Sequence, residues 1–144
     1  MTRMDDIADR VELRALVDRA AVASDARDRE RYGACFTERG ILSGSHGHEV
    51  EGRPAIGGVL DTFDALFPQS MHVVGTHEVT LDGDVAHGVV YCLSHHVVER
   101  SSGQREALNV ARYLDDYERT PTGWLISKRF INIEWQEERP LVIE

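Results

Sequence analysis

The sequence predicts an α+β fold shaped like a cone, with N-terminal helices packed on a strongly curved, mostly antiparallel sheet. Apolar residues recur at helical spacing through residues 4–67, whereas residues 71–135 show long apolar runs separated by tight-turn signals. Helices followed by a strand meander are typical of α+β domains. Long strands must twist and coil, so a sheet that cups helices leaves an open mouth, where we expect a pocket.

Three helices are expected before the strands. Residues 4–24 carry an apolar stripe at helical spacing. Asp28 is a suitable N-cap for a short second helix, which ends at Gly40 and has an inner side formed by Tyr32, Cys35 and Phe36. A third helix begins at Pro54, since proline is tolerated in a first turn, and ends at Pro68.

The pattern of the rest of the chain predicts hairpins. Residues 41–51 are rich in turn residues and predict a small hairpin. Asp82-Gly83-Asp84 between apolar runs is a strong tight-hairpin signal. The four long strands are expected at residues 71–81, 85–98, 107–117 and 124–135. No repeat or linker interrupts this pattern, so we expect one domain over residues 1–144.

Composition excludes several classes of partner. The formal net charge of −9 disfavours nucleic acid and anionic membrane surfaces. No apolar stretch approaches the roughly 18 residues of a membrane span, and no secretory leader opens the chain, which predicts a cytoplasmic protein. Cys35 and Cys92 lie far apart in apolar surroundings and are expected to be buried free thiols.

No sequence motif indicates a cofactor or a metal ion. Glycine-rich phosphate loops and the Gly-x-Ser-x-Gly context of serine hydrolases are absent. His46 and His48 lie in a glycine-rich loop, and the adjacent histidines 95 and 96 diverge on a strand, so neither pair predicts zinc. We therefore expect chemistry that depends on side chains alone.

Two residues form the main catalytic hypothesis. Asp25 lies at the end of the first helix, where the negative end of the helix dipole disfavours an acid, and Asp28 already serves as a cap. His72 opens the first long strand in an otherwise apolar segment. If the fold brings them together, they form an acid/base pair. The alternatives are a solvated turn aspartate and a histidine that only fills the core.

Alternation along the next two strands supplies further candidates. His96 shares a face with Ser94 and Cys92, whereas His95 shares the other face with Tyr91, so at most one of the two histidines faces the pocket. We take His96 as the third catalytic candidate and Tyr91 and His95 as candidates for substrate binding. On the third long strand, Asn109 and Tyr113 share a face and complete the expected substrate-binding set, although an ordinary core position is the safer interpretation of Tyr113.

Four stretches resemble the SnoaL-like group of the nuclear-transport-factor-like superfamily. They are residues 16–28, Cys35-Phe36-Thr37 with Gly40, Gly52-Arg53-Pro54-Ala55-Ile56, and residues 112–117 with Gly123-Trp124. The resemblance implies the cone-shaped fold. It is strongest to the dehydratase branch, which includes scytalone dehydratase and the bile-acid dehydratases. That branch implies an aspartate on the first helix facing a histidine on the first long strand, which Asp25 and His72 match, and a further histidine, which His96 matches most closely.

The chain departs from that branch at positions that concern substrate. The resemblance would place a tyrosine on the first helix where Ala20 and Ser24 stand, and an arginine on the last strand near Ile133. The expected function is a cofactor-independent lyase or isomerase of dehydratase or cyclase type, acting on an apolar, cyclic small molecule. The alternatives are a non-catalytic ligand-binding module and the small subunit of a ring-hydroxylating oxygenase.

The outer sheet face is expected to join two copies of the chain. Leu108, Val110 and Leu114 share the face opposite to Asn109, and Leu125 is expected to extend it. An apolar outer face predicts a symmetric homodimer.

Overall fold

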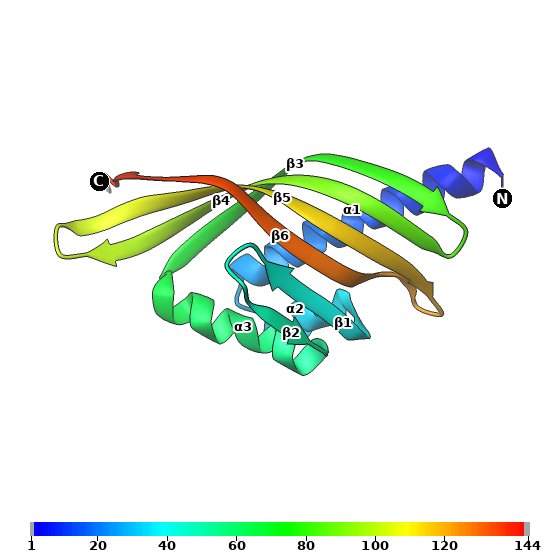
Figure 1. Cartoon of the computed structure of the whole chain (residues 1–144), viewed down its shortest axis with the longest axis horizontal. Coiled ribbons are helices and arrows are strands. Elements are labelled where there is room, and N and C mark those ends of the chain that lie inside the picture. The colour runs from blue at the N-terminus through cyan, green and yellow to red at the C-terminus, as the bar shows by residue number, and fades with distance from the viewer. Residues whose placement is uncertain (1, 143–144) are drawn as a thin grey trace.

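The computed structural model describes residues 2–142 (Figure 1). Its helices are α1 (Arg3–Asp25), α2 (Arg29–Ala34) and α3 (Arg53–Leu66). Its strands are β1 (Phe36–Gly44), β2 (Glu49–Glu51), β3 (Gln69–Asp82), β4 (Val85–Arg100), β5 (Gly103–Thr120) and β6 (Gly123–Pro140). These elements confirm the predicted α+β class and the order of helices and strands.

The described strands form one six-stranded sheet in the order β2-β1-β6-β5-β4-β3. All neighbours are antiparallel except β1 and β6, which run parallel. Figure 1 shows the long strands twisting as they arch over the helices, with the β4–β5 turn and the end of β6 extending beyond α3. The helices therefore cover only part of the sheet.

The second helix is shorter than the sequence predicts. It ends at Ala34, and Phe36 begins β1 instead of continuing the helix. Phe36 lies opposite Ile126 in the parallel pair, and its carbonyl accepts a hydrogen bond from the Arg53 guanidinium at 2.8 Å. Partners distant in sequence satisfy this backbone, so sheet pairing overrides the local helical pattern.

Irregularities in the sheet change which side chains face inward, and two of them alter the pattern expected for β3 and β6. Between Val74 and His77 the register of β3 shifts, so that Val74 and His77 both lie on the inner side while Thr76, which strict alternation would place beside Val74, is exposed. A second shift lies opposite Asp116 and Tyr117 in β5 and brings Arg129 of β6 to the inner face. Strict alternation fails on both strands for this reason.

The core lies between the inner sheet face and the helices. The fully buried side chains of α1 are Leu13, Leu16, Val17, Ala20 and Ala23. Cys35 and Cys92 are buried free thiols in the same core, as predicted. Leu125 also packs in the core at 8% exposure, so the expectation that it extends the outer face is wrong.

Helix α1 covers the edge of the sheet. Strand β3 is an edge strand, and such a strand presents unpaired carbonyls to its surroundings. Arg10 donates to the Val79 carbonyl at 2.6 Å, and Arg14 donates to the carbonyls of Gly75 and Val74 at 2.6 and 3.1 Å. The arginines of α1 thus satisfy backbone groups that have no strand partner, and they fix the helix along β3.

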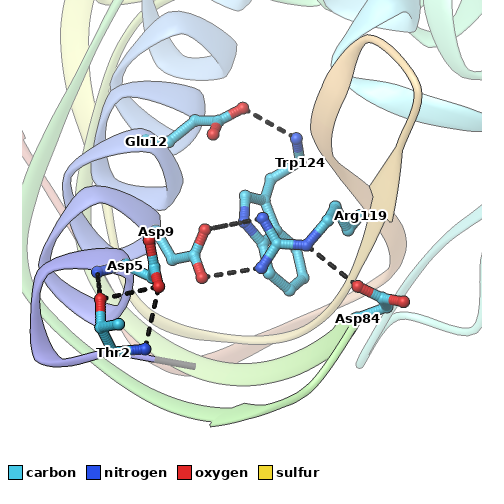
Figure 2. Close-up of polar contacts among 7 residues, drawn as sticks. All are labelled: Thr2, Asp5, Asp9, Glu12, Asp84, Arg119 and Trp124. Atoms are coloured by element: carbon cyan, nitrogen blue, oxygen red, sulfur yellow. Dashed lines mark hydrogen bonds and ion pairs between the residues drawn. The ribbon is translucent and has the colours of Figure 1, made fainter.

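A polar cluster attaches the start of α1 to the β5–β6 hairpin (Figure 2). Asp9, only 4% exposed, accepts two hydrogen bonds from Arg119 at 2.8 Å and one from the Trp124 indole at 2.9 Å. Arg119 also stacks on the Trp124 ring and bonds Asp84. The hydrogen bonds from Arg119, aided by the one from Trp124, lower the pKa of Asp9 below 3.8 and outweigh burial, which acts to raise it.

We predict that Asp9→Asn lowers the free energy of unfolding by about 2 kcal/mol at neutral pH, because the charged hydrogen bonds to Arg119 are lost. The depressed native pKa means that this stabilisation is present above 3.8 and is lost as pH falls through the native pKa. Urea unfolding at several pH values should therefore show the two proteins converging in acid. Asp82→Asn, at an exposed aspartate that ends β3, is the control; equal losses in both variants would contradict the prediction.

Candidate functional site

A cavity of about 580 Å³ lies between the helices and the concave face of the sheet. Its wall is mostly apolar, with contributions from Val17, Ala20, Val59, Phe63, Val74 and Ile131. The polar side chains that reach it include His72, His96, Asn109, Tyr113 and Arg129. This is the arrangement expected of a site for a small, largely apolar molecule held in one orientation by a few polar groups.

Asp25 and His72 meet at the wall of this cavity. The Nδ1 atom of His72 lies 2.6 Å from Oδ1 of Asp25, and the His72 backbone N–H donates to Oδ2 at 2.8 Å. The His72 side chain is 10% exposed and the Asp25 side chain is 23% exposed. The ring lines the cavity and the carboxylate lies behind it. The end of α1 and the start of β3 thus bring together two residues 47 positions apart.

The electrostatics of the pair keep the carboxylate charged. Burial acts to raise the pKa of Asp25, but hydrogen bonds from His72 and Ser70 outweigh it, and the pKa lies below 3.8. A carboxylate accepts only, so Nδ1 of His72 carries a proton and the neutral ring is left with Nε2 as its basic nitrogen. His72 is thereby oriented as a base with its acceptor nitrogen free for a ligand.

His96 lies beside His72 in a different environment. The two ring centroids are 5.6 Å apart and the rings are nearly perpendicular. The Phe67 ring lies over His96, with centroids 4.3 Å apart. Burial lowers the pKa of His96 to about 4, with a further contribution from His72. No carboxylate bonds the ring of His96, and burial keeps that ring neutral at pH 7.

The Nδ1 atom of His96 is buried and has no hydrogen-bond partner among residues 2–142. A buried N–H without an acceptor is rarer in proteins than an acceptor without a donor. The tautomer with its proton on Nε2 avoids an unpaired N–H at this position. In that tautomer His96 donates a hydrogen bond from Nε2.

The remaining sequence candidates divide between the two faces of the sheet. Asn109 and Tyr113 line the cavity; the Asn109 side chain accepts from Gln136 at 2.7 Å, and Tyr113 is 6% exposed. Tyr91 and His95 lie on the outer face, so the expectation that they bind a ligand in the pocket is wrong. Tyr91 is 45% exposed with the Arg112 guanidinium 5.1 Å from its ring, and His95 bonds Glu106. The alternation of β4 places them opposite His96.

Sequence reasoning missed Arg129 at the inner face of β6. It is 3% exposed and donates to both carboxylate oxygens of Asp115 at 2.7 Å. Its guanidinium lies 4.7 Å from the centroid of the Tyr113 ring, and the residue lines the cavity. Strict alternation along β6 would place Lys128 on the inner face together with Ile126. Nothing in the sequence marks the bulge that places Arg129 on that face instead.

The described residues offer no obvious place for a metal ion. Across residues 2–142, no three histidine, cysteine, aspartate or glutamate side chains gather in a geometry that would bind one. His46 and His48 both line the cavity, in the loop between β1 and β2.

Comparison with known proteins gives a family over most of the chain. A SnoaL-like domain matches residues 5–130. An uncharacterized protein of Mycobacterium tuberculosis is 30% identical over 132 residues, which cover 90% of this chain and 88% of the relative.

Two similar solved structures have names that refer to elimination reactions. A hexachlorocyclohexane dehydrochlorinase, LinA type 2, superposes with a TM-score of 0.89 at 15% identity, covering 98% of this chain and 95% of its own. A protein of Novosphingobium aromaticivorans described provisionally as a scytalone dehydratase superposes with a TM-score of 0.86 at 13% identity, covering 98% and 94%. At these identities the likeness establishes the shared fold.

We predict that His96 titrates near pH 4 in the folded protein, because burial disfavours its charged form. The unfolded chain binds a proton near pH 6.5, so between about 4 and 6.5 the unfolded state holds more protons and stability rises with pH. The slope from this residue reaches at most about 1.4 kcal/mol per pH unit. NMR titration of the ring and urea unfolding check both statements. His96→Phe should reduce the slope; a midpoint near 6.5 would refute the prediction.

Proposed function

This chain belongs to the SnoaL-like family, and we propose that it is a cofactor-independent lyase or isomerase that acts on an apolar, cyclic small molecule. One observation carries the proposal. His72 and Asp25 form a 2.6 Å hydrogen-bonded pair at the wall of a mostly apolar cavity of about 580 Å³. A carboxylate that orients an imidazole in a pocket is a ready acid/base device.

In the proposed reaction, Nε2 of His72 removes a proton from a carbon of the bound ring. The electron pair of the broken C–H bond forms a carbon–carbon double bond as the leaving group departs with its own electron pair. Asp25 stabilises the imidazolium that forms, because its carboxylate accepts the Nδ1–H at 2.6 Å. The proton then passes from His72 to the departing group or to solvent. An isomerase would return it to another carbon.

Neighbouring polar groups are suited to the charge that develops on the substrate. In the tautomer with its proton on Nε2, neutral His96 serves as a hydrogen-bond donor to an oxygen or a leaving group. Asn109 and Tyr113 line the same cavity and are the candidates for holding a carbonyl oxygen as it gains negative charge. Arg129, with its charge balanced by Asp115, adds a positive group to that wall.

The names of the structural neighbours favour elimination as the reaction class. Dehydrochlorination removes hydrogen and chloride, and dehydration removes the elements of water, so both fit proton removal by a base in an apolar pocket. They also suggest probes. Hexachlorocyclohexane tests loss of chloride, and a cyclic β-hydroxy ketone tests loss of water, which produces a conjugated enone that absorbs in the ultraviolet.

We predict that His72→Ala and Asp25→Asn each lower turnover of a responsive probe by about 10²–10⁴-fold, the usual contribution of a positioned base. Chloride release and enone absorbance measure the rates, and circular dichroism checks the fold. The chain offers a matched control in His87 and Asp116, an exposed pair joined by the same kind of Nδ1 to Oδ1 contact, at 2.7 Å. His87→Ala and Asp116→Asn should keep the wild-type rate.

Two outcomes of this experiment would count against catalysis. Unchanged rates in the His72 and Asp25 variants would remove the pair from the mechanism. A molecule that co-purifies with the protein and is recovered unaltered after incubation would favour the ligand-binding module instead.

We also propose that the outer face of the sheet binds a second copy of the chain. Its exposed apolar side chains are Met71, Val73, Tyr91, Leu93, Leu114 and Trp135, and the half-buried Leu108 and Val110 lie among them. Leu93 lies opposite both Val73 and Val110, so the patch is continuous across β3, β4 and β5. A contiguous apolar patch of this kind is typical of an interaction surface.

We predict that Leu93→Lys shifts the protein from dimer to monomer, because a lysine at the centre of the patch would have to be desolvated in the interface. Sedimentation velocity over a range of concentrations measures the change. Val22→Lys, at an apolar residue of α1 that is 54% exposed, should leave the dimer intact. A wild-type protein that stays monomeric at high concentration would refute the proposed interface.

A further inference from the structure

Arg27 has an unusual backbone for its residue type. It lies between α1 and α2 with φ of 55°, the only non-glycine residue with positive φ among the described residues. For a residue with a Cβ, the left-handed region costs roughly 1–2 kcal/mol. Such a conformation persists only where the surrounding contacts determine it, and it often occurs near functional sites.

The guanidinium of Arg27 makes the contacts that hold this residue in place. The Arg27 side chain is only 16% exposed. Nη1 donates to the Ser24 carbonyl at 2.9 Å and to the Ser70 hydroxyl at 2.7 Å. Nη2 donates to the Phe67 carbonyl at 2.8 Å. One planar group therefore connects the end of α1, the end of α3 and the start of β3.

Two of these contacts lead directly to the histidines of the cavity. Ser70 accepts from Arg27 and donates its hydroxyl proton to Oδ1 of Asp25 at 2.8 Å, the same oxygen that lies 2.6 Å from Nδ1 of His72. Phe67, whose carbonyl Arg27 binds, lays its ring over His96. A rigid guanidinium fork suits this task, since its donors have fixed directions.

We propose that Arg27 is a positioning residue for both cavity histidines. Through Ser70 it fixes the Asp25 carboxylate on His72, and through the Phe67 carbonyl it fixes the Phe67 ring that lies over His96. This inference deepens the proposed function of the same site. Its experiment measures the histidine rings themselves, so it does not depend on finding a substrate.

A purely structural role for Arg27 has its own signature. The last turns of α1 and α3 contain no basic residue, and Arg27 places a cation on a carbonyl at the end of each helix. If Arg27 only caps these helices, its loss lowers stability without changing the histidines. Ser70→Ala separates the two roles, because it breaks the connection to Asp25 and keeps both capping contacts.

The experiment compares wild type, Arg27→Gln and Ser70→Ala by NMR of the histidine rings. The Nδ1 proton of His72 should resonate far downfield in the wild type and should shift upfield or broaden in both variants. Removal of the Arg27 charge, which acts to lower the pKa of His96 after the larger effects of burial and His72, should raise that pKa from about 4 in Arg27→Gln alone. Asp64→Asn removes only the 3.8 Å ion pair to Arg27 and should leave both signals unchanged.

A second variant protects the test against misfolding. Glycine suits φ of 55°, so Arg27→Gly removes the side chain without straining the backbone. Guanidinium ion added at millimolar, non-denaturing concentration should partly restore the His72 proton signal in this variant. Wild-type signals in folded Arg27→Gly and Ser70→Ala would overturn the proposal. Changed signals together with undiminished turnover in His72→Ala would instead refute only the proposed chemistry.

Discussion

The candidate site depends on one carboxylate that accepts three hydrogen bonds from a single strand. Asp25 ends α1 and takes the Ser70 hydroxyl, the His72 backbone N–H and the His72 ring N–H, at 2.8, 2.8 and 2.6 Å. A partly buried carboxylate at a helix C-terminus is unfavourable unless its lone pairs are used. Here they are used by the strand that contains the histidine. The contact that removes the electrostatic cost of Asp25 therefore also orients His72.

The rest of α1 holds that contact in place. Arg10 and Arg14 bind carbonyls of the same edge strand, and Asp9 anchors the other end of the helix to Arg119 and Trp124 (Figure 2). Polar contacts thus fix the helix along its length, while its apolar face packs in the core. A helix held at both ends has little freedom to slide, so the distance between Asp25 and His72 is set by the whole helix.

The cavity gives two neighbouring imidazoles different properties. His72 has a carboxylate partner, whereas His96, with its ring centroid 5.6 Å away, has an aromatic ring and an orphaned nitrogen. One is oriented by a charge, and the other is kept neutral by burial. Two groups of the same type are thereby suited to complementary tasks, proton removal and hydrogen-bond donation. Arg27 contacts the supports of both, which explains how one strained residue can be retained between two helices.

The sequence by itself determined the fold class, the order of the elements, and Asp25, His72, His96, Asn109 and Tyr113 as candidates. Those predictions rest on periodicity and turn chemistry, which act over a few residues, and on the resemblance to a family. Alternation along β4 also placed Tyr91 and His95 on one face and His96 on the other. It left open only which of the two faces was the inner one. The tertiary structure alone decided the inward position of Arg129, the early start of β1 at Phe36 and the contacts of Arg27. Each depends on a bulge, a parallel pairing or a three-way contact between segments far apart in the chain, and no local pattern encodes such geometry.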